Sequence, residues 1–251
     1  MLENEKHIQI ELADGVMTIR FNRPEKKNAI TADMYARLAS ALDEANDSDD
    51  VRSVLFLGTV GVFTAGNDIA DFAKIAMSGE RDSTAVFDFL ERIIMAPKPM
   101  VAGVDGLAIG VGTTMLLHCD YVVASHNAKF KTPFVDLGLV PEAGSSLLLP
   151  ELAGHHRSFA LLAMGEAFGP TDAQETGFVN RVVPTANLEA AALEYAKAIA
   201  AKPVEAMKLS RDLIRGDRTP ILNRMREEAV LFEQRLESDE AKQAFMAFMS
   251  K

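Results

Sequence analysis

The sequence predicts an α/β fold with a helical C-terminal region. Short apolar runs alternate with amphipathic helical patterns along the first part of the chain, which is typical of strands connected by helices. The run Val54-Leu55-Phe56-Leu57 is apolar at every position, as expected for a strand in a sheet that is covered on both faces. From about residue 151 onward the pattern is helical almost throughout. We therefore expect a core in residues 1–168 and a helical region in residues 169–251.

Length and composition exclude several classes of protein. A chain of 251 residues with 48% hydrophobic side chains can bury a full core without disulfide or metal staples. The net charge of −10 and the absence of a basic run argue against nucleic acid and anionic membrane partners. The single cysteine, Cys119, excludes an internal disulfide and a cysteine-based metal cluster, which suits a reducing compartment. Without an apolar signal core or an apolar run of membrane-spanning length, we expect a cytoplasmic protein that does not bind membranes.

The first predicted elements are a hairpin and a helix. Residues 7–12 and 16–21 alternate between apolar and polar side chains as two strands, and Asp14-Gly15 between them favours a hairpin turn. A polar loop spans residues 22–29, and Thr31 then provides an N-cap for a helix. The apolar residues of that helix recur at helical spacing: Met34, Leu38, Ala41, Leu42 and Ala45. The buried strand at residues 54–57 follows.

The alternation of strands and helices continues to about residue 130. A short strand within residues 61–69 ends in a glycine turn, residues 75–83 are loop-like, and Val86 begins the apolar face of a helix that Pro97 stops. The next elements are a strand over 100–104, an apolar helix over 110–117, and strands over 121–124 and 128–130. The second part is expected to hold helices over 155–164, 171–176, 188–201, 204–215, 220–236 and from 238 onward, with one strand-like segment at 178–184.

One carboxylate stands apart from the charged helix faces. Glu142 follows an apolar stretch and lies in a turn bracketed by Pro141 and Gly144. Such an acid is either a catalytic base or a charge that caps the helix starting near Ser145, because acids are favoured in first helical turns. Taken alone, this stretch leaves both readings open.

Two glycine turns offer backbone N–H groups to a ligand. Residues 65–68 end a strand with the sequence Ala-Gly-Asn-Asp, and residues 109–112 begin a helix with Ile-Gly-Val-Gly. N–H groups at such turns can converge on one oxygen that gains negative charge, and glycine lets the backbone approach it closely. Ordinary turns explain each glycine equally well. The spacing does not match a dinucleotide-binding fingerprint.

Other kinds of catalytic site find little support. No serine lies in a Gly-x-Ser-x-Gly elbow, and no His, Asp and Glu cluster has the spacing of metal ligands. The polar loop over residues 22–29 carries three basic side chains, Arg23, Lys26 and Lys27. They are either solvated or able to pair with the phosphates of an acidic ligand.

Together these stretches resemble the crotonase (enoyl-CoA hydratase/isomerase) superfamily over almost the whole chain. Residues 21–29 contain Asn22-Arg23-Pro24 and are similar to the family loop that lies against coenzyme A. Residues 63–69 and 106–112 resemble its two oxyanion segments, and residues 178–184 resemble its late marker before the C-terminal helices. The resemblance implies a crotonase-like ββα spiral core with the acyl-CoA site in residues 1–168, and an oligomerisation region in residues 169–251.

The resemblance assigns roles to individual residues. The backbone N–H groups of Asn67 and Val111 are expected to form the oxyanion hole for a thioester oxygen, although Val111 replaces the usual second glycine. Asp68 is expected to brace this loop or cap the next helix rather than react. The expected substrate-binding residues are Lys26, Asn28, Ala65, Gly66, Asn67, Asp68, Ile69, Gly110 and Val111.

Two departures from the family pattern concern the acids. Hydratases of the family carry two glutamates, and the corresponding positions here are Thr114 and Phe134. The carboxylate is instead Glu142, whose placement resembles the Δ3,Δ2-enoyl-CoA isomerase branch of peroxisomal type. The resemblance therefore favours Glu142 as a catalytic base over the capping reading.

The expected reaction converts a 3-enoyl-CoA into a 2-trans-enoyl-CoA in fatty-acid beta-oxidation. Glu142 moves a proton from C2 to C4, and its apolar neighbours are expected to raise its pKa. This chemistry uses no metal and no separate cofactor, since coenzyme A belongs to the substrate. The alternatives are another crotonase-type acyl-CoA enzyme (an enoyl-CoA hydratase, a dehalogenase or an aromatic-catabolism enoyl-CoA isomerase) and a non-catalytic acyl-CoA-binding member.

Two further expectations concern assembly and substrate length. By resemblance we expect a homotrimer or a dimer of trimers, and the apolar set Phe245, Phe248 and Met249 fits either that assembly or packing within one chain. The region from residue 70 to residue 87 is expected to shape the acyl pocket.

Overall fold

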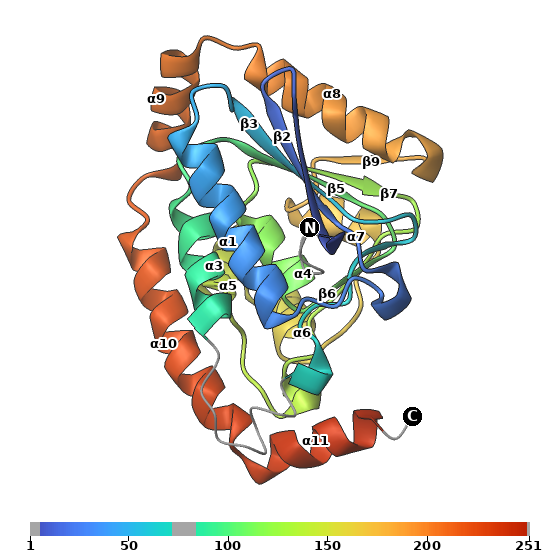
Figure 1. Ribbon diagram of the computed structural model, residues 1–251. Coiled ribbons are helices and arrows are strands. Elements are labelled where there is room, and N and C mark those ends of the chain that lie inside the picture. The colour runs from blue at the N-terminus through green and yellow to red at the C-terminus, as the bar shows by residue number, and fades with distance from the viewer. Residues whose placement is uncertain (1–5, 72–83, 250–251) are drawn as a thin grey trace.

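The computed structural model describes residues 6–71 and 84–249, and Figure 1 shows their arrangement. The loop expected at residues 75–83, and with it most of the segment expected to shape the acyl pocket, lies outside the described residues. The expected division into residues 1–168 and 169–251 stays a prediction.

A six-stranded sheet forms the centre of the molecule, and its strands lie in the order β1-β2-β3-β5-β7-β9. β1 pairs with β2 antiparallel, and every later pair is parallel. The strands are β1 (Ile8–Ala13), β2 (Val16–Phe21), β3 (Ser53–Leu57), β5 (Met100–Val104), β7 (Tyr121–Ser125) and β9 (Arg181–Val183). The hairpin, the central strands and the late strand were all predicted.

Helices cover both faces of this sheet, as the unbroken apolar run in β3 predicted. Leu55 and Leu57 pack with α8 (Leu188–Ala200) on one face. Val54 and Phe56 point to the other face and join the main core with α1 (Ala32–Asp47) and α3 (Thr84–Met95). Alternate residues of a strand point to opposite faces, so β3 serves two hydrophobic clusters. Figure 1 shows α8 on one side of the sheet and α1 with α3 on the other.

The helix after the polar loop begins where the sequence predicted. Thr31 is its N-cap, and the Thr31 hydroxyl accepts a hydrogen bond from the Met34 N–H at 3.3 Å. Met34, Leu38 and Leu42 lie on the buried face of α1 and are completely inaccessible to solvent. Each such side chain stabilises the fold by about 1.5–3 kcal/mol relative to its exposed state.

A second, three-stranded parallel sheet was only partly predicted. It consists of β4 (Val62–Thr64), β6 (Leu107–Ile109) and β8 (Lys129–Lys131), with β6 in the centre. No strand was predicted over residues 107–109, because three residues are too few to show a strand-like alternation. The strand matters because it aligns the turns on either side of it.

The remaining helices surround these two sheets. The apolar helix expected over residues 110–117 divides into α4 (Val111–Thr114) and a 3-10 turn, Met115–His118. The other helices are α5 (Ser145–Ala153), α6 (His155–Leu162), α7 (Pro170–Thr176), α9 (Val204–Arg215), α10 (Thr219–Leu236) and α11 (Asp239–Met249). No helix within the described residues combines the length and the apolar character needed to cross a membrane.

Candidate functional site

The candidate residues gather at one edge of the three-stranded sheet. β4, β6 and β8 run parallel, so their carboxyl ends lie on the same edge. The chain leaves β4 into Gly66 and Asn67, leaves β6 into Gly110 and Val111, and leaves β8 into the segment that reaches Glu142. The small sheet therefore brings together three stretches that lie far apart in the sequence.

Gly66 packs directly against the turn that follows β6. Its φ of 82° is left-handed, and a Cβ built at this position would lie 2.5 Å from the Ile109 carbonyl oxygen. Glycine alone meets both conditions, because it tolerates positive φ and has no Cβ to clash. The contact places the Gly66-Asn67 turn beside the Ile109-Gly110 peptide.

A short bridge orients the N–H of Asn67. The Ile30 N–H donates to the Gly66 carbonyl at 2.8 Å, and the Asp68 N–H donates to the Ile30 carbonyl at 2.9 Å. Successive N–H groups along extended backbone point to opposite sides, so the N–H of Asn67 faces away from Ile30. Within the described parts of the chain it has no hydrogen-bond partner.

Val111 supplies a second N–H at the start of α4. The preceding residue, Gly110, has φ 56° and ψ −121°, and its carbonyl accepts hydrogen bonds from the N–H groups of Thr113 and Thr114. The first residue of a helix has no intrahelical acceptor for its N–H, and over residues 6–71 and 84–249 the Val111 N–H has none elsewhere. Within these residues, both N–H groups are therefore available to donate to a ligand.

Tyr35 holds the side chain of Asn67 and was missed from the sequence. The Tyr35 hydroxyl donates a hydrogen bond to Asn67 Oδ1. Tyr35 is 1% exposed, and burial, followed by the nearby charge of Glu142, raises the pKa of its phenol well above the ordinary value. The phenol therefore stays protonated and remains a donor. Its position beside Met34 on the buried face of α1 indicates only a core residue, which is why the sequence carried no signal.

Glu142 is a buried carboxyl beside the same edge. It is 3% exposed, and the Thr114 hydroxyl donates a hydrogen bond to its Oε1 at 3.2 Å. Thr114 lies at the end of α4, whose first residue is Val111. The carboxyl and the Val111 N–H are therefore linked through one short helix.

The environment of Glu142 favours its protonated form. Burial raises the pKa of the carboxyl to about 8, because an isolated charge is poorly solvated inside the protein. The hydrogen bond from Thr114 lowers this pKa, and the negative charge of Glu228 contributes to raising it. The predicted upward shift by desolvation thus agrees with the structure, and a group with this pKa can both take and return a proton near neutral pH.

The alternative role of Glu142 as a helix cap is wrong. The N-cap of α5 is Gly144, which has no side chain to accept a hydrogen bond from the first turn. The carboxylate that accepts these N–H groups belongs to Glu228 on α10, which accepts from the Gly144 N–H at 2.6 Å and from the Ser146 N–H at 3.0 Å. Glu228 was missed because it lies in a run of charged helical residues that is typical of a solvated face.

The predicted coenzyme A loop is held together by a buried asparagine. Asn28 is fully buried, and its amide donates to Thr59 Oγ1 at 3.0 Å and to the carbonyls of Val62 and Phe63 at 3.0 and 3.1 Å. Its side chain therefore stabilises the loop, while Lys26 on the same loop is exposed. Substrate contacts by Lys26 and Asn28 stay predictions.

Asp68 braces the Asn67 turn, as predicted. Its carboxylate pairs with Arg23 Nη1 at 2.6 Å and accepts the Ala70 N–H at 3.0 Å. Burial opposes the ionised form, but these bonds hold the pKa of Asp68 below its ordinary value. On either side of the turn, the Ala65 N–H donates to the Lys27 carbonyl at 2.9 Å and Ile69 packs against the main core.

The two positions at which hydratases of the family carry glutamates lie inside the protein. Thr114 is 1% exposed and Phe134 is 4% exposed, and neither can exchange a proton in the manner of a carboxylic acid. In the part of the chain that the structure describes, no group of three or more His, Cys, Asp or Glu side chains is placed to hold a metal ion.

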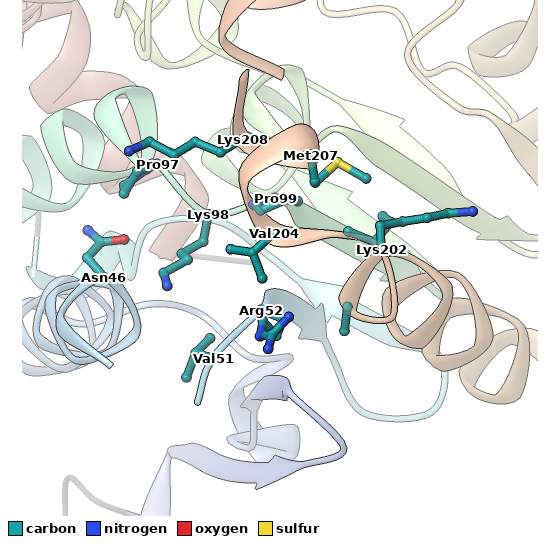
Figure 2. Close-up of a pocket in the computed structure, with 12 residues that line it drawn as sticks. Asn46, Val51, Arg52, Pro97, Lys98, Pro99, Lys202, Val204, Met207 and Lys208 are labelled. Atoms are coloured by element: carbon teal, nitrogen blue, oxygen red, sulfur yellow. The ribbon is translucent and has the colours of Figure 1, made fainter. Parts of the chain in front are cut away.

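A separate cavity lies at the amino-terminal ends of strands β3 and β5 of the six-stranded sheet. Figure 2 shows it between the start of β3, the segment before β5 and the start of α9, with Val51, Pro99 and Val204 in its wall. Its cationic lining residues are Arg52, Lys98, Lys202 and Lys208. None of the predicted site residues lines this cavity, so it is distinct from the edge that carries Asn67, Val111 and Glu142.

Comparison with known proteins finds a matching family model and relatives that align with most of this chain. Residues 11–251 match a family model described as enoyl-CoA hydratase/isomerase. The chain is 34% identical to enoyl-CoA delta isomerase 2 of Rattus norvegicus over 99% of its own length. It spans only 65% of the rat protein's length.

Two more relatives extend the comparison to bacteria. The 1,2-epoxyphenylacetyl-CoA isomerase of Escherichia coli is 33% identical, over 83% of this chain and 82% of that protein. The crystal structure of an enoyl-CoA hydratase/isomerase from Pseudoalteromonas atlantica superposes with a TM-score of 0.92 at 39% identity, covering 98% of this chain and 97% of the other. The matches cover both the sheet region and the C-terminal helices.

Proposed function

This chain belongs to the enoyl-CoA hydratase/isomerase family, and from that premise we propose that it is a Δ3,Δ2-enoyl-CoA isomerase of fatty-acid beta-oxidation. The observation that carries this proposal is the buried carboxyl of Glu142 at the edge that also carries the Asn67 and Val111 N–H groups, neither of which has a hydrogen-bond partner within the described residues. Glu228, the other buried carboxyl near it, has both oxygens occupied by the N–H groups of Gly144 and Ser146. One proton-transferring acid suits isomerisation rather than water addition.

The reaction begins when the Glu142 carboxylate takes a proton from C2 of the 3-enoyl-CoA. The electrons of the C2–H bond form a C1–C2 double bond, and the thioester oxygen becomes an enolate. The N–H groups of Asn67 and Val111 donate to that oxygen, and loss of one such donor costs about 10²–10³ in rate in a known acyl-transfer enzyme. Positioned before the reaction, these donors stabilise the charge without reorganisation.

The second step returns the same proton at C4. The dienolate electrons form the new C4–H bond and leave a double bond between C2 and C3, while the thioester carbonyl reforms. Glu142 ends as a carboxylate, so the cycle is complete without a redox or metal cofactor, and coenzyme A enters and leaves with the substrate. A positioned base of this kind contributes typically about 10²–10⁴ in rate.

The direct test is an assay of purified protein with a series of 3-enoyl-CoAs, beside Glu142→Gln. We expect kcat to fall by about 10²–10⁴ in this variant because the base is lost. Asp136→Asn is a matched control, since Asp136 is an exposed carboxylate on the same segment with a salt bridge to Lys131. Equal activity of wild type and Glu142→Gln would refute the assignment of the base.

A second candidate is isomerisation of an aromatic-catabolism acyl-CoA, favoured by the similarity to the Escherichia coli 1,2-epoxyphenylacetyl-CoA isomerase. The same oxyanion hole would serve that thioester. A parallel assay with 1,2-epoxyphenylacetyl-CoA distinguishes the two candidates through kcat/KM. Addition of water to 2-enoyl-CoA at a comparable rate would favour a hydratase, and binding without turnover of any of these substrates would favour a non-catalytic role.

The proposed assembly is a homotrimer or a dimer of trimers. Phe245 does not support it, because this side chain is buried in the core of its own chain, and the side chains of Phe248 and Met249 lie outside the described residues. Support comes instead from α9, where Leu213 and Ile214 are each 85% exposed. Light scattering of the purified protein measures the assembly, and a monomer at micromolar concentration would contradict it. A cytoplasmic location stays a prediction.

A further inference from the structure

The turn that carries Glu142 has an unusual backbone. Ala143 has φ 61° and Gly144 has φ 68°, so two successive residues adopt the left-handed conformation. An alanine rarely adopts this conformation, because its Cβ approaches the following carbonyl oxygen. A strained backbone of this kind persists only when the surrounding structure holds it in place.

One side of this turn is held by Glu228. Its Oε2 accepts the Gly144 N–H at 2.6 Å, and its Oε1 accepts the Ser146 N–H at 3.0 Å and the Ser146 hydroxyl at 2.5 Å. Glu228 is 5% exposed and projects from α10, far from Glu142 in the sequence. All three donors require acceptors, and an ionised carboxylate is the one side chain group that accepts on both of its oxygens.

The other side of the turn is held by His118. Its Nε2 lies 2.8 Å from the Ala143 carbonyl oxygen, and because a carbonyl only accepts, Nε2 carries the proton. Burial lowers the pKa of His118 to about 4, so the ring is neutral at physiological pH. The carbonyl and the N–H of the peptide between Ala143 and Gly144 are therefore both fixed by buried side chains from other elements.

We propose that Glu228 is a positioning residue for the base, whose carboxylate holds Gly144 and Ser146 and thereby sets the direction in which the Glu142 carboxyl leaves the turn. This inference rests on the proposed function in so far as Glu142 is the base. The hydrogen bonds of Glu228 to Gly144 and Ser146 lie within the turn, so its role is assigned through the placement of Glu142.

The charge of Glu228 gives a second effect that a purely structural brace would lack. After burial, this charge is the other cause that raises the pKa of Glu142. Among the described residues, Thr114 from α4, Tyr35 from α1 and the neutral His118 also interact with Glu142 or its turn. Arg224 lies near Glu228 and donates to Ser146 Oγ at 3.4 Å. Removal of the Glu228 charge should therefore lower the pKa of Glu142.

Three variants separate position from charge. Glu228→Gln keeps the shape and removes the charge, Glu228→Asp keeps the charge and shortens the reach, and Glu227→Gln removes a charge from an exposed neighbour on the same helix. For both Glu228 variants we expect kcat to fall by about 10- to 100-fold with KM nearly unchanged, because a misplaced catalytic group can cost about 10² in rate. Glu227→Gln should match wild type.

The pH profile distinguishes the charge effect from misplacement. The limb of kcat/KM that reports the free Glu142 carboxyl should move to lower pH in Glu228→Gln and stay near its wild-type position in Glu228→Asp. Wild-type kcat and an unmoved limb in Glu228→Gln would overturn the proposal. An equal shift of the limb in Glu227→Gln would overturn it too, since any charge on α10 would then suffice.

A second readout is independent of the proposed reaction. Infrared difference spectra recorded during a pH titration follow the protonated carboxyl band, and the band that Glu142→Gln lacks belongs to Glu142. We expect this band to titrate at lower pH in Glu228→Gln than in wild type. The measurement needs no substrate, so it tests Glu228 even if the 3-enoyl-CoA assay fails. If Glu228→Gln does not fold, Glu228→Asp carries the kinetic test, and an unchanged kcat in that variant would refute the positioning role.

Discussion

The oxyanion side and the carboxyl side of the candidate site are held in different ways. The N–H groups of Asn67 and Val111 are placed mainly by backbone, through strands β4 and β6 and the close contact of Gly66 with Ile109, with the side chains of Asp68 and Tyr35 bracing the Asn67 turn. Glu142 is placed by side chains, through Thr114 and through the carboxylate of Glu228, which holds the following turn.

Because of this difference, the oxyanion side and the carboxyl side respond differently to pH. Backbone donors cannot titrate, so the oxyanion side offers the same dipoles at every pH. The carboxyl side contains two buried acids, Glu142 and Glu228, whose pKa values are both raised by burial. Mutations on the first side should change transition-state stabilisation alone, whereas mutations on the second should also change the pH dependence of stability and activity.

Among variants of the oxyanion half, the largest effect is expected from Gly66→Ala. The new Cβ would lie 2.5 Å from the Ile109 carbonyl oxygen, so the two turns must separate and the Asn67 N–H must move. We expect kcat/KM to fall by about 10²–10³, as for the loss of one oxyanion donor. Steady-state kinetics with a 3-enoyl-CoA measure this fall.

Gly216→Ala is the matched control for that variant. Gly216 also has a positive φ, of 61°, but no heavy atom lies within 4 Å of a Cβ built there. With ψ at −156°, an alanine there should lose about 1–3 kcal/mol of stability through backbone strain, and the variant should keep its activity. Comparable loss of activity in both variants would mean that strain, rather than the contact with Ile109, explains the effect of Gly66→Ala.

The next effect is a pH-dependent gain of stability in Glu142→Gln. The carboxyl has its ordinary pKa of 4.5 when unfolded and about 8 when folded, so the folded state binds more protons between these values. The wild-type free energy of unfolding therefore falls as pH rises from about 4.5 to 8. The glutamine side chain in this variant has no proton to lose, so the variant should gain on the order of a few kcal/mol over wild type by about pH 9.

Urea unfolding at a series of pH values measures this gain. The difference in the free energy of unfolding between Glu142→Gln and wild type should be small near pH 5 and should grow toward pH 9. Asp136→Asn, in which an exposed carboxyl on the same segment is removed, is the control. A difference that is independent of pH would show that the Glu142 carboxyl does not titrate within this range.

The same contrast between the two halves explains what the sequence could predict. The glycine turns and the Thr31 cap depend on neighbouring residues, so local patterns indicated them correctly. The strand β6 was not predicted because it has only three residues, Leu107–Ile109. Its pairing with β4 and β8 is what brings the turns at Gly66 and Gly110 to one edge.

The supports of the carboxyl side left no local trace in the sequence. Glu228 is surrounded by charged residues on α10, and Tyr35 lies among apolar residues on α1. A residue in a charged helical run is usually exposed to solvent, and a residue in an apolar helical run usually belongs to the core. Two readings of Glu142, as a base and as a helix cap, remained open from the turn alone. The contacts of Glu228 with Gly144 and Ser146 explain why α5 does not need Glu142 as its cap.

The smallest effect is expected from Tyr35→Phe, which probes the point where the two halves meet. Tyr35 donates to Asn67 Oδ1 on the oxyanion side, and its pKa responds to the charge of Glu142. Loss of one hydrogen bond costs about 0.5–1.5 kcal/mol, so kcat should fall by roughly 2- to 10-fold. The phenylalanine keeps the packing against Phe89, whose ring centroid lies 5.7 Å away, so the fold should persist. Tyr121→Phe, on the large sheet beside Tyr195, is the control and should leave kcat unchanged. A fall in kcat larger than about 100-fold would contradict a positioning role and indicate that the Tyr35 hydroxyl itself contacts the reacting atoms.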